Sequence, residues 1–480
     1  MSSLDIKGGG PRLNSMLLKL SESVDKIPLT RTHWATILLV VAGMFFDILE
    51  SNSLGLAGPQ IIATFGISKA EFALISSMTF IGLTIGAYLG GMLSDIKGRK
   101  FALVANLVVY SVGGVLCALA PNYEVLMGSR LIVGIGLGGE LAVGIALICE
   151  IMPTKYRAQA VAALNVGSGG LGNVVAPAYA ALVLVALGNF FGGPQVAWRW
   201  LFGLLILPVL LVLVIRRNMP ESPRFLLTRG DIAGANRSLT ALAAGRIPDE
   251  EIHIKVEDLH DDDGAAVVRP QKIRLGEIFT RGLRRRTATA SGAYFMVVAA
   301  QMSLLTLMPT FLVARGSTIG QSLLYTLIMQ IGSLLGALCA ATITYRFRRR
   351  TVMVTGAVLG CLVGLGFGLM ANTDPLILIF GSLFQFFTLL LTTTLWSWAP
   401  ELFPTRVRGF GVSFVKGTGG LGIIVMPPLI ALIFDKAGLP GVFTTMAIMF
   451  AITALLALAG VETKDQTLEE ANEARPVFHA

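Results

Sequence analysis

The chain has 480 residues, of which 54% are hydrophobic and only 14% are charged, with a formal net charge of +9. Soluble domains carry about 25% charged residues, so this composition excludes an ordinary soluble enzyme, a disordered regulator and a small disulfide-built module. Glycine is abundant, at 54 residues, and membrane helices tolerate glycine because it lets helix backbones approach closely. The composition predicts an integral membrane protein.

Twelve mostly apolar stretches, each of roughly 20 residues or more, are long enough to cross a bilayer as helices. We expect an all-α fold with a first six-helix bundle over 33–215, a linker over 216–286, a second bundle over 287–460 and polar tails over 1–32 and 461–480. The expected spans are 33–62, 69–94, 101–120, 124–151, 157–188, 196–215, 287–313, 319–344, 351–371, 374–402, 407–434 and 440–460.

The basic residues predict the orientation of the chain in the membrane. Of the 38 Lys and Arg residues, all but six lie in the tails, the linker and the loops on the same side. By the positive-inside rule this side is cytoplasmic, so the chain is expected to cross a cell membrane, with a bacterial inner membrane the simplest location. The six exceptions are Lys69, Arg130, Arg199, Arg315, Lys416 and Lys436.

The second half of the sequence repeats the first at an offset of about 250 residues. The segment from Gly167 to Gly172 recurs from Gly417 to Gly422, and Glu150–Arg157 recurs as Glu401–Arg408. Both glycine segments also fit the dinucleotide fingerprint, but they lie in apolar helices rather than in a βαβ unit, so we interpret them as packing surfaces. Two bundles with the same orientation can rock about a site between them, which indicates transport rather than chemistry.

Several motifs resemble those of the major facilitator superfamily of transporters. The loop Gly90–Lys100 is similar to the signature loop of that superfamily, and further matches lie at Arg130–Gly136, Pro220–Arg224 and Pro400–Arg406. The segment from Asp47 to Glu50 resembles the acidic element of aromatic-acid/proton symporters, and Gly138–Leu141 resembles the helix 4 pattern of niacin-type members. The loop motifs are also similar to those of the sugar-porter-like branch.

Five ionisable residues are predicted deep within spans: Asp47, Glu50, Arg130, Glu140 and Lys416. Such residues cost about 2.5 to 3.5 kcal/mol each to insert, and they commonly mark a transport pathway. Asp47 and Glu50 share one helix face. We expect Glu50 first, and Asp47 second, to carry a proton with Arg130 as the modulating partner. The alternative is a static buried ion pair that fixes helix packing.

Lys416 and Glu140 are predicted near the middle of the membrane, in opposite halves. We expect Lys416 to bind a substrate carboxylate, with a pair between Lys416 and Glu140 or another acid as the alternative. Polar and aromatic residues of neighbouring spans can line the same site, although each can also be an ordinary contact between helices. These candidates are Asn165, Gln301, Gln330, Gln385, Trp396 and Trp398.

We interpret the loop motifs as parts of gates that close the transport pathway. The resemblance implies that Asp95 and Arg99 contact the neighbouring helix ends near Arg406 and Arg408, or the positive N-terminus of the eleventh span, and stabilise the state that is closed to the cytoplasm. The second-half counterpart of Asp95 is Tyr345, so this contact is not symmetric. We also expect two matching latches, Glu150 with Arg157 and Glu401 with Arg408.

The sequence therefore predicts a secondary transporter that couples proton entry to import of a small organic acid, aromatic or nicotinate-like. A sugar or polyol:proton symporter and a drug/proton antiporter have the same architecture and stay open, and a non-transporting receptor is a further alternative. The expected partners are the small-molecule substrate, H⁺ and the lipid bilayer, with the chain acting as a monomer. No enzyme activity, metal, cofactor or nucleic-acid partner is expected.

Overall fold

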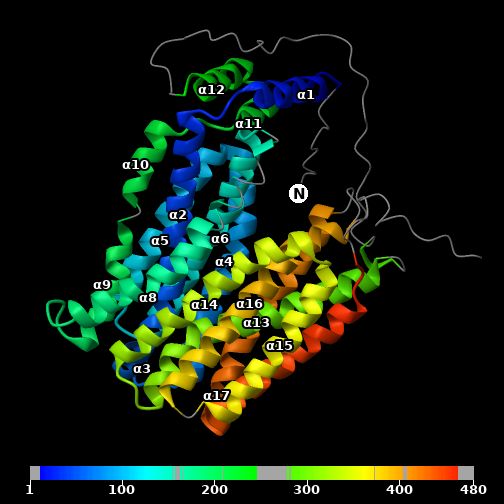
Figure 1. Cartoon of the computed structure of the whole chain (residues 1–480). Helices are drawn as coiled ribbons and strands as arrows, with labels where there is room; N and C mark the ends of the chain where they lie inside the picture. The colour runs from blue at the N-terminus through cyan, green and yellow to red at the C-terminus, as the bar shows by residue number, and fades with distance from the viewer. Residues whose placement is uncertain are drawn as a thin grey trace, which may run out of the picture.

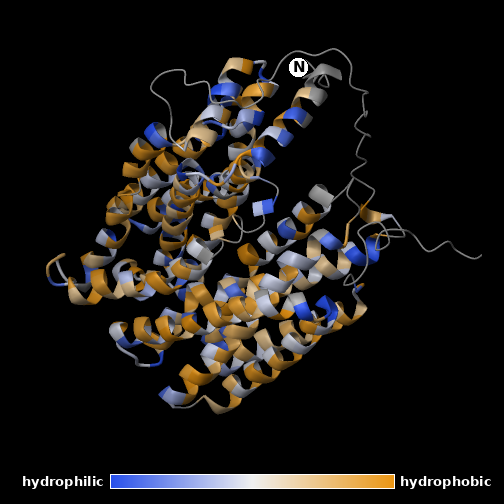
Figure 2. Ribbon diagram, turned by 45° about the horizontal axis from the view of Figure 1, so that its top comes forward, coloured by the Kyte–Doolittle hydropathy of each residue, from blue (hydrophilic) through white to orange (hydrophobic). Residues whose placement is uncertain are grey.

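A computed structural model describes residues 11–153, 155–156, 160, 163–164, 166–207, 209–245, 278–280, 283–371, 373–403 and 408–462. In these ranges the regular structure is helical, with no strand, which confirms the all-α prediction. Figure 1 shows two groups of helices, one from each half of the chain, that lean together at one end and diverge at the other. Hydrophobic residues cover the bodies of these helices in Figure 2.

The first group contains four long helices and several shorter ones among the described residues. The predicted span 33–62 is divided at Ala57, where Pro59 lies at the start of the second piece. The described part of the span 157–188 contains two π-helical stretches, and the span 196–215 is also divided. The elements are α2 (Arg31–Leu56), α3 (Gly58–Phe65), α4 (Lys69–Lys97), α5 (Arg99–Leu119), α6 (Tyr123–Ile151), η1 (Val166–Gly172), α8 (Asn173–Ala181), η2 (Leu182–Ala186), α9 (Pro194–Gly203), η3 (Leu204–Ile206) and α10 (Val209–Asn218).

The second group consists of α13 (Arg284–Ala314), α14 (Ile319–Arg346), α15 (Arg349–Met370), α16 (Asp374–Glu401) and α17 (Arg408–Ala459). With 52 residues, α17 is about 78 Å long at 1.5 Å per residue, far more than a bilayer core of about 30 Å. Gly438 interrupts it with a φ of 60° and a ψ of −161°, so α17 supplies two spans. The described residues contain 11 helical segments long and apolar enough to span a membrane, and the divided α17 brings the number to the predicted twelve.

Three short helices lie at the end of the molecule where the linker leaves the first group, which we call the linker side (Figure 1). They are α1 (Pro11–Lys26), α11 (Pro223–Thr228) and α12 (Ile232–Ala244). The hydroxyl groups of Thr30 and Thr32 donate to the carbonyl oxygens of Leu242 (2.6 Å) and Ala241 (2.9 Å). The N-terminal segment was predicted only as a polar tail, but α1 buries Met16, Leu20 and Val24 on one face.

Glycines allow the closest approaches between helices, and they do so at repeated positions. A Cβ atom on Gly82 or Gly86 of α4 would lie 2.2 Å and 2.0 Å from carbonyl oxygens of α6. At equivalent positions of α14, a Cβ on Gly332 or Gly336 would lie 2.2 Å and 2.1 Å from carbonyl oxygens of α16. The duplication in the sequence therefore reproduces the same backbone contact in both groups.

The two glycine segments that fit the dinucleotide fingerprint are packing surfaces. In the first half, Gly172 lies against Ile48 of α2, where an added Cβ would be 2.8 Å from that side chain. In the second half, Gly419 lies against the ring of Tyr294 of α13, at 2.3 Å from an added Cβ. Both segments sit within helices, as the interpretation from sequence requires.

We predict that Gly86→Leu destabilises the protein, because the new side chain meets a carbonyl oxygen that belongs to the α6 backbone. Overpacking of this kind costs about 1–3 kcal/mol or more. The matched control is Gly91→Leu on the same helix, where no atom lies within 4 Å of an added Cβ. The thermal unfolding of the purified protein in detergent is the measurement, and equal melting temperatures for the two variants would contradict the packing argument.

Candidate functional site

Glu50 and Arg130 form an ion pair in the interior of the first group. The Arg130 Nη1 donates to Glu50 Oε1 at 2.6 Å, and both residues are fully buried. The guanidinium also donates from Nε to the hydroxyl of Thr79 at 3.2 Å and lies over the ring of Phe202, at 5.5 Å from its centroid. The charge of Glu50 is therefore balanced by a cation that is itself held by α4 and α9.

Asp47 and Glu140 form a second buried pair, made of two acids. Their carboxyl groups, from α2 and α6, are within hydrogen-bonding distance of each other. Gly43 makes room for this contact, because a Cβ there would lie 2.1 Å from Glu140 Oε1. Since a hydrogen bond between two carboxyl groups requires a proton on one of them, the contact is attractive only when the pair holds a proton.

Neither acid of this second pair has a cation to balance it in the part of the chain that the structure describes. The ion pairs there join other residues. The outer oxygens, Asp47 Oδ1 and Glu140 Oε2, also lack a hydrogen-bond partner although they are buried. Burial of a carboxylate without partners costs free energy. The interior of the protein therefore favours the protonated form of this pair.

Lys416 lies on α17 beside an aromatic wall from two other helices. Its Nζ is 4.8 Å from the ring centroid of Trp396 on α16, and Trp396 Nε1 donates to the hydroxyl of Tyr294 on α13 at 3.0 Å. Gly420, one turn along the same face of α17, comes within 3.9 Å of Thr84 of α4 when a Cβ is added. This face of α17 is therefore turned toward the first group, and Lys416 is exposed on it beside the partly exposed Trp396 of α16.

The other polar candidates are distributed over the second group. Gln301 Oε1 accepts a hydrogen bond from the Thr392 hydroxyl at 3.1 Å, and Gln330 and Gln385 are buried, the latter with an unpartnered Oε1. Trp398 is fully buried, and its Nε1 donates to the Val461 carbonyl at 3.2 Å, so it lies apart from Trp396. Asn165 lies outside the described residues. Tyr294 is not predictable from the sequence as a site residue, because its contact with Trp396 depends on how α13 is rotated about its axis.

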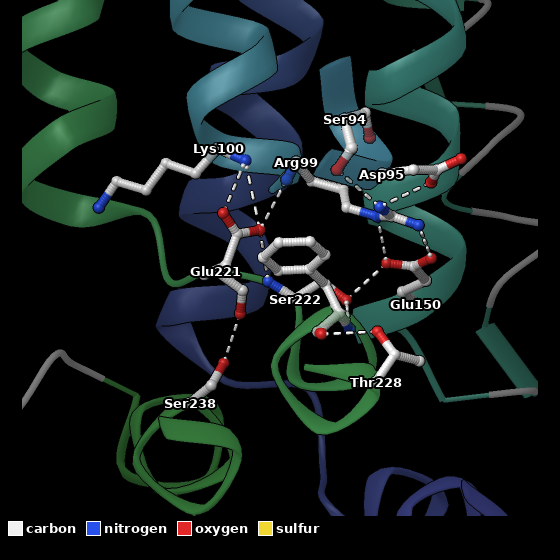
Figure 3. A network of polar contacts seen from close by, with 10 residues as sticks. Ser94, Asp95, Arg99, Lys100, Glu150, Glu221, Ser222, Thr228 and Ser238 are labelled. Carbon is white, nitrogen blue, oxygen red and sulfur yellow. Dashed lines mark hydrogen bonds and ion pairs between the residues drawn. The ribbon is translucent and has the colours of Figure 1, made fainter. Parts of the chain in front are cut away.

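A network of charges joins the linker-side ends of the first group (Figure 3). Arg99 donates to both oxygens of Glu150, at 3.0 Å each, and to Asp95 Oδ1 at 3.0 Å. Glu150 also accepts from the hydroxyl of Ser222, at the start of α11. The Glu221 carboxylate accepts from the backbone amides of Arg99 and Lys100 and so caps the first turn of α5. Burial raises the pKa of Glu221, and these amide hydrogen bonds oppose that rise.

The second group repeats this arrangement. Arg349 Nη2 lies 3.3 Å from Glu401 Oε1, as Arg99 lies beside Glu150. The Glu462 carboxylate accepts from the backbone amides of Arg349 and Arg350, at 3.2 Å each, as Glu221 does at the start of α5. Each group therefore has an arginine–glutamate pair and a second glutamate that caps the same helix.

The expected latches, Glu150 with Arg157 and Glu401 with Arg408, stay predictions. Arg157 lies outside the described residues, as does the side chain of Arg408. Glu221 and Glu462 are contributors that the sequence did not identify. Each of these two acids follows the last span of its half, a position from which the repeat could have revealed them.

Contacts between the two groups concentrate on the side opposite the linker, which we call the far side. Lys69 Nζ at the start of α4 is 2.6 Å from Asp435 Oδ1 of α17, and it lies over the ring of Phe434. Deeper along α4, the hydroxyl of Ser77 donates to the Ile424 carbonyl at 2.6 Å. At the linker side the Asp95 side chain is 74% exposed. Arg99 binds Glu150 and Asp95 of its own group, and Arg406 lies outside the described residues.

Known proteins share this architecture. The model of the sugar (and other) transporter family matches residues 18–474. A niacin transporter of Acinetobacter baylyi is 29% identical over 454 residues, which cover 94% of this chain and 99% of that one. A probable 4-methylmuconolactone transporter of Cupriavidus pinatubonensis is 27% identical over 447 residues, covering 92% and 93%.

Solved structures share the fold at lower sequence identity. A D-xylose-proton symporter superposes with a TM-score of 0.68 at 18% identity, covering 90% of this chain and 99% of that one. A bacterial homologue of the human lysosomal transporter Spinster, in an inward-facing conformation, gives a TM-score of 0.66 at 17% identity, covering 89% and 97%.

The protein has many membrane-spanning helices in two related groups, with buried charges between the helices. This combination is typical of a membrane transporter. The chain belongs to the sugar (and other) transporter family, within the major facilitator superfamily. This confirms the resemblance found in the sequence and the expectation that the protein is not an enzyme.

We predict that the far-side pair Lys69–Asp435 stabilises the conformation described here. Asp435→Asn removes the attraction, which for a partly exposed pair is worth about 0–1 kcal/mol, so the ratio of the two states shifts by up to about fivefold. Spin labels at positions 97 and 347, on the linker side of the two groups, report the change as a larger population of short distances. The double exchange Lys69→Asp with Asp435→Lys is expected to restore the distribution, and an unchanged distribution in Asp435→Asn would count against this role.

Proposed function

We propose that this protein is a proton-coupled symporter that imports a small aromatic carboxylate by alternating access. The linker side is cytoplasmic in this proposal, in keeping with its basic loops, and the membrane is a bacterial inner membrane. The conformation described here is then the one open to the cytoplasm. The observation that carries the proposal is the buried carboxyl pair of Asp47 and Glu140, which is attractive only with a proton and has no cation among the described residues.

In this proposal the exchangeable proton resides on Asp47 and Glu140 rather than on Glu50. Glu50 is engaged by Arg130 at 2.6 Å with both groups fully buried, which favours the alternative of a static pair for these two residues. Arg130 keeps a modulating role, because it removes one negative charge from the neighbourhood of the acid pair. A group that binds and releases a proton must have protonated and deprotonated forms of similar free energy. The pair of Asp47 and Glu140 meets that condition better than Glu50, whose negative charge is held by Arg130.

The substrate in this proposal is bound by Lys416 with the aromatic wall of Trp396 and Tyr294. A cation next to a partly exposed indole suits a flat, anionic ligand, since the ammonium can pair with the carboxylate while the ring stacks on Trp396. Niacin, named for one relative, is an aromatic carboxylate. Gln301, Gln330 and Gln385 are proposed to contribute hydrogen bonds from α13, α14 and α16.

The two sites lie in different groups of helices, so coupling acts through the movement of one group against the other. A proton on the acid pair removes the repulsion between Asp47 and Glu140, and a bound anion neutralises Lys416. Each event removes a charge from the central region, and the rocking movement is easiest when both have occurred. The repeated pairs Arg99–Glu150 and Arg349–Glu401, with Asp95, keep the linker-side helix ends rigid during that movement.

A sugar or polyol symporter is the second candidate. The buried amides of Gln301, Gln330 and Gln385 are neutral groups of the kind that bind hydroxyl-rich ligands, and the D-xylose-proton symporter has the same fold. Competition of radiolabelled nicotinate uptake by xylose, by nicotinamide and by benzoate separates the candidates, because an anion site binds benzoate more tightly than the two neutral compounds.

We predict that Glu140→Gln abolishes accumulation of nicotinate driven by a pH gradient in proteoliposomes but preserves exchange of nicotinate across the membrane. The amide cannot release the shared proton, whereas ligand binding at Lys416 is untouched. Glu50→Gln is the comparison: it leaves Arg130 buried without its partner, at a cost of about 3–5 kcal/mol, so its main effect should be a lower melting temperature. Undiminished pH-driven accumulation by Glu140→Gln would overturn the assignment.

We also predict that Lys416→Ala weakens nicotinate binding far more than binding of the neutral amide nicotinamide. Loss of a charge-assisted contact corresponds to about tenfold or more in affinity. Binding is measured by isothermal titration calorimetry on the purified protein, with Lys436→Ala as a control lysine on the same helix. Equal losses for the acid and the amide would remove Lys416 from the substrate site.

A further inference from the structure

The helix α5 presents two unpartnered hydrogen-bond donors to the interior of the first group. Asn106 and Tyr110 are one turn apart on the same face and are only 6% and 1% exposed. Asn106 Nδ2 and the Tyr110 hydroxyl have no hydrogen-bond partner. Buried polar groups are nearly always hydrogen-bonded, so two such donors on one face call for an explanation.

Packing holds this face against the part of α6 that carries Glu140. A Cβ on Gly139 would lie 2.5 Å from the Asn106 amide group, and a Cβ on Gly136 would lie 2.5 Å from the backbone nitrogen of Tyr110. Gly139 immediately precedes Glu140, and Gly136 lies one turn before it. The absence of side chains at these two glycines lets α5 approach the acid pair closely.

The unpartnered acceptors lie in the same interior. Asp47 Oδ1, Glu140 Oε2 and Glu50 Oε2 are buried and lack a partner, and the charges of Glu140, Asp47 and Glu50 act on the Tyr110 hydroxyl. Donors on α5 and acceptors on α2 and α6 are thus matched in kind but not in direct contact. A buried water typically makes about three hydrogen bonds to groups of this sort. Water between the helices would accept from a donor on α5 and donate to an acceptor on α2 or α6.

We propose that Asn106 and Tyr110 are positioning residues of the proton site, which donate through bridging water to the Asp47–Glu140 pair and stabilise it when its proton leaves. This inference rests on the proposed function, because it supplies a missing part of the same site. When the pair is protonated, the two donors can bind only its outer oxygens, which carry no full charge. Their hydrogen bonds become stronger when the proton leaves and the pair becomes negatively charged.

The remaining charged groups near this face do not compete for the role. From α2 the face meets Asp47 and Glu50, and from α6 it meets Glu140 and Arg130, the latter bonded to Glu50. Cys117 of α5 itself lies near Arg130. Arg199 of α9 donates to the Ala118 and Ala120 carbonyls at the far-side end of α5. The charged residues of α4 and α10 occupy helix ends.

The test is a pH titration of the ligand-free protein in lipid, followed by infrared difference spectroscopy of carboxyl C=O stretching. The band of the acid pair is the one that disappears in Glu140→Gln. In Tyr110→Phe, which removes only the hydroxyl, the midpoint of that band is expected to move to higher pH by about 0.5 to 1 unit, the equivalent of one net hydrogen bond. The pH profile of nicotinate exchange in proteoliposomes should move in the same direction.

Tyr123→Phe is the matched control, because the Tyr123 hydroxyl already donates to the Glu71 carbonyl near the start of α6 and lies away from the acids. Asn106→Leu is the second variant, with a smaller shift in the same direction, and it decides the matter if Tyr110→Phe does not fold. If a folded Tyr110→Phe or Asn106→Leu variant has the same band midpoint as the wild type, this inference is wrong, and the proposed function is not affected. Absence of any titrating carboxyl band in the wild type overturns the proton site of the proposed function as well.

Discussion

The cost of burying carboxyl groups governs the organisation of the first group of helices. Among the residues that the structure describes, three acids, Asp47, Glu50 and Glu140, lie in its interior with one cation, Arg130. Arg130 is committed to Glu50 at 2.6 Å, so the other two acids must be neutralised in another way. Because two adjacent carboxylates repel each other strongly where the dielectric is low, a shared proton is the least costly solution. The close approach that makes sharing possible depends on Gly43, which has no side chain to separate the acids.

The two halves are alike where they are mechanical and different where they carry charge. The glycine contacts of α4 recur in α14, and the pair Arg99–Glu150 recurs as Arg349–Glu401. The interior charges do not recur, since the second half has the cation Lys416 beside Trp396 and no counterpart of the acid pair in its described residues. In the proposed function, this duplicated frame with unlike contents separates the proton site of the first half from the anion site of the second half. A symmetric movement of the two halves would then couple two different ligands.

Much of the fold could be predicted from the sequence because hydrophobic length and repeats are properties of the chain itself. The number of spans, the duplication and the packing role of the glycine segments followed from these patterns. The break at Ala57 and the π-helical stretches did not, since they depend on how neighbouring helices pack. The pairing of Asp47 with Glu140 was also missed. Residue counts from the ends of straight helices put these acids at different depths, whereas tilt and rotation bring them into contact.

The partners of the linker-side acids show the same limit. Local spacing suggests Arg157 for Glu150, a contact that lies outside the described residues and stays a prediction. The structure shows a partner that spacing did not suggest: Arg99 of α5, 51 positions away, binds both carboxylate oxygens of Glu150 with its fork-shaped guanidinium. Glu221 adds a second carboxylate to the same helix end by accepting from two backbone amides. Sequence spacing identified Glu150 and Glu401 but not Glu221, and the packing of the helices is what brings Arg99 to Glu150.

The balance between the two conformations of such a transporter rests on contacts that are individually weak. On the far side, the pair Lys69–Asp435 and the hydrogen bond from Ser77 to the Ile424 carbonyl join the groups. Each is worth about 1 kcal/mol or less. On the linker side Asp95 is exposed, where the closing movement of the proposed function would bring it toward the second group. Weak contacts on both sides keep two such states within a few kcal/mol of each other, which is the range that the proposed protonation of one carboxyl pair and binding of one anion can reverse. A strong latch at either end would hold the protein in one state, and the charges in its interior would then have nothing to control.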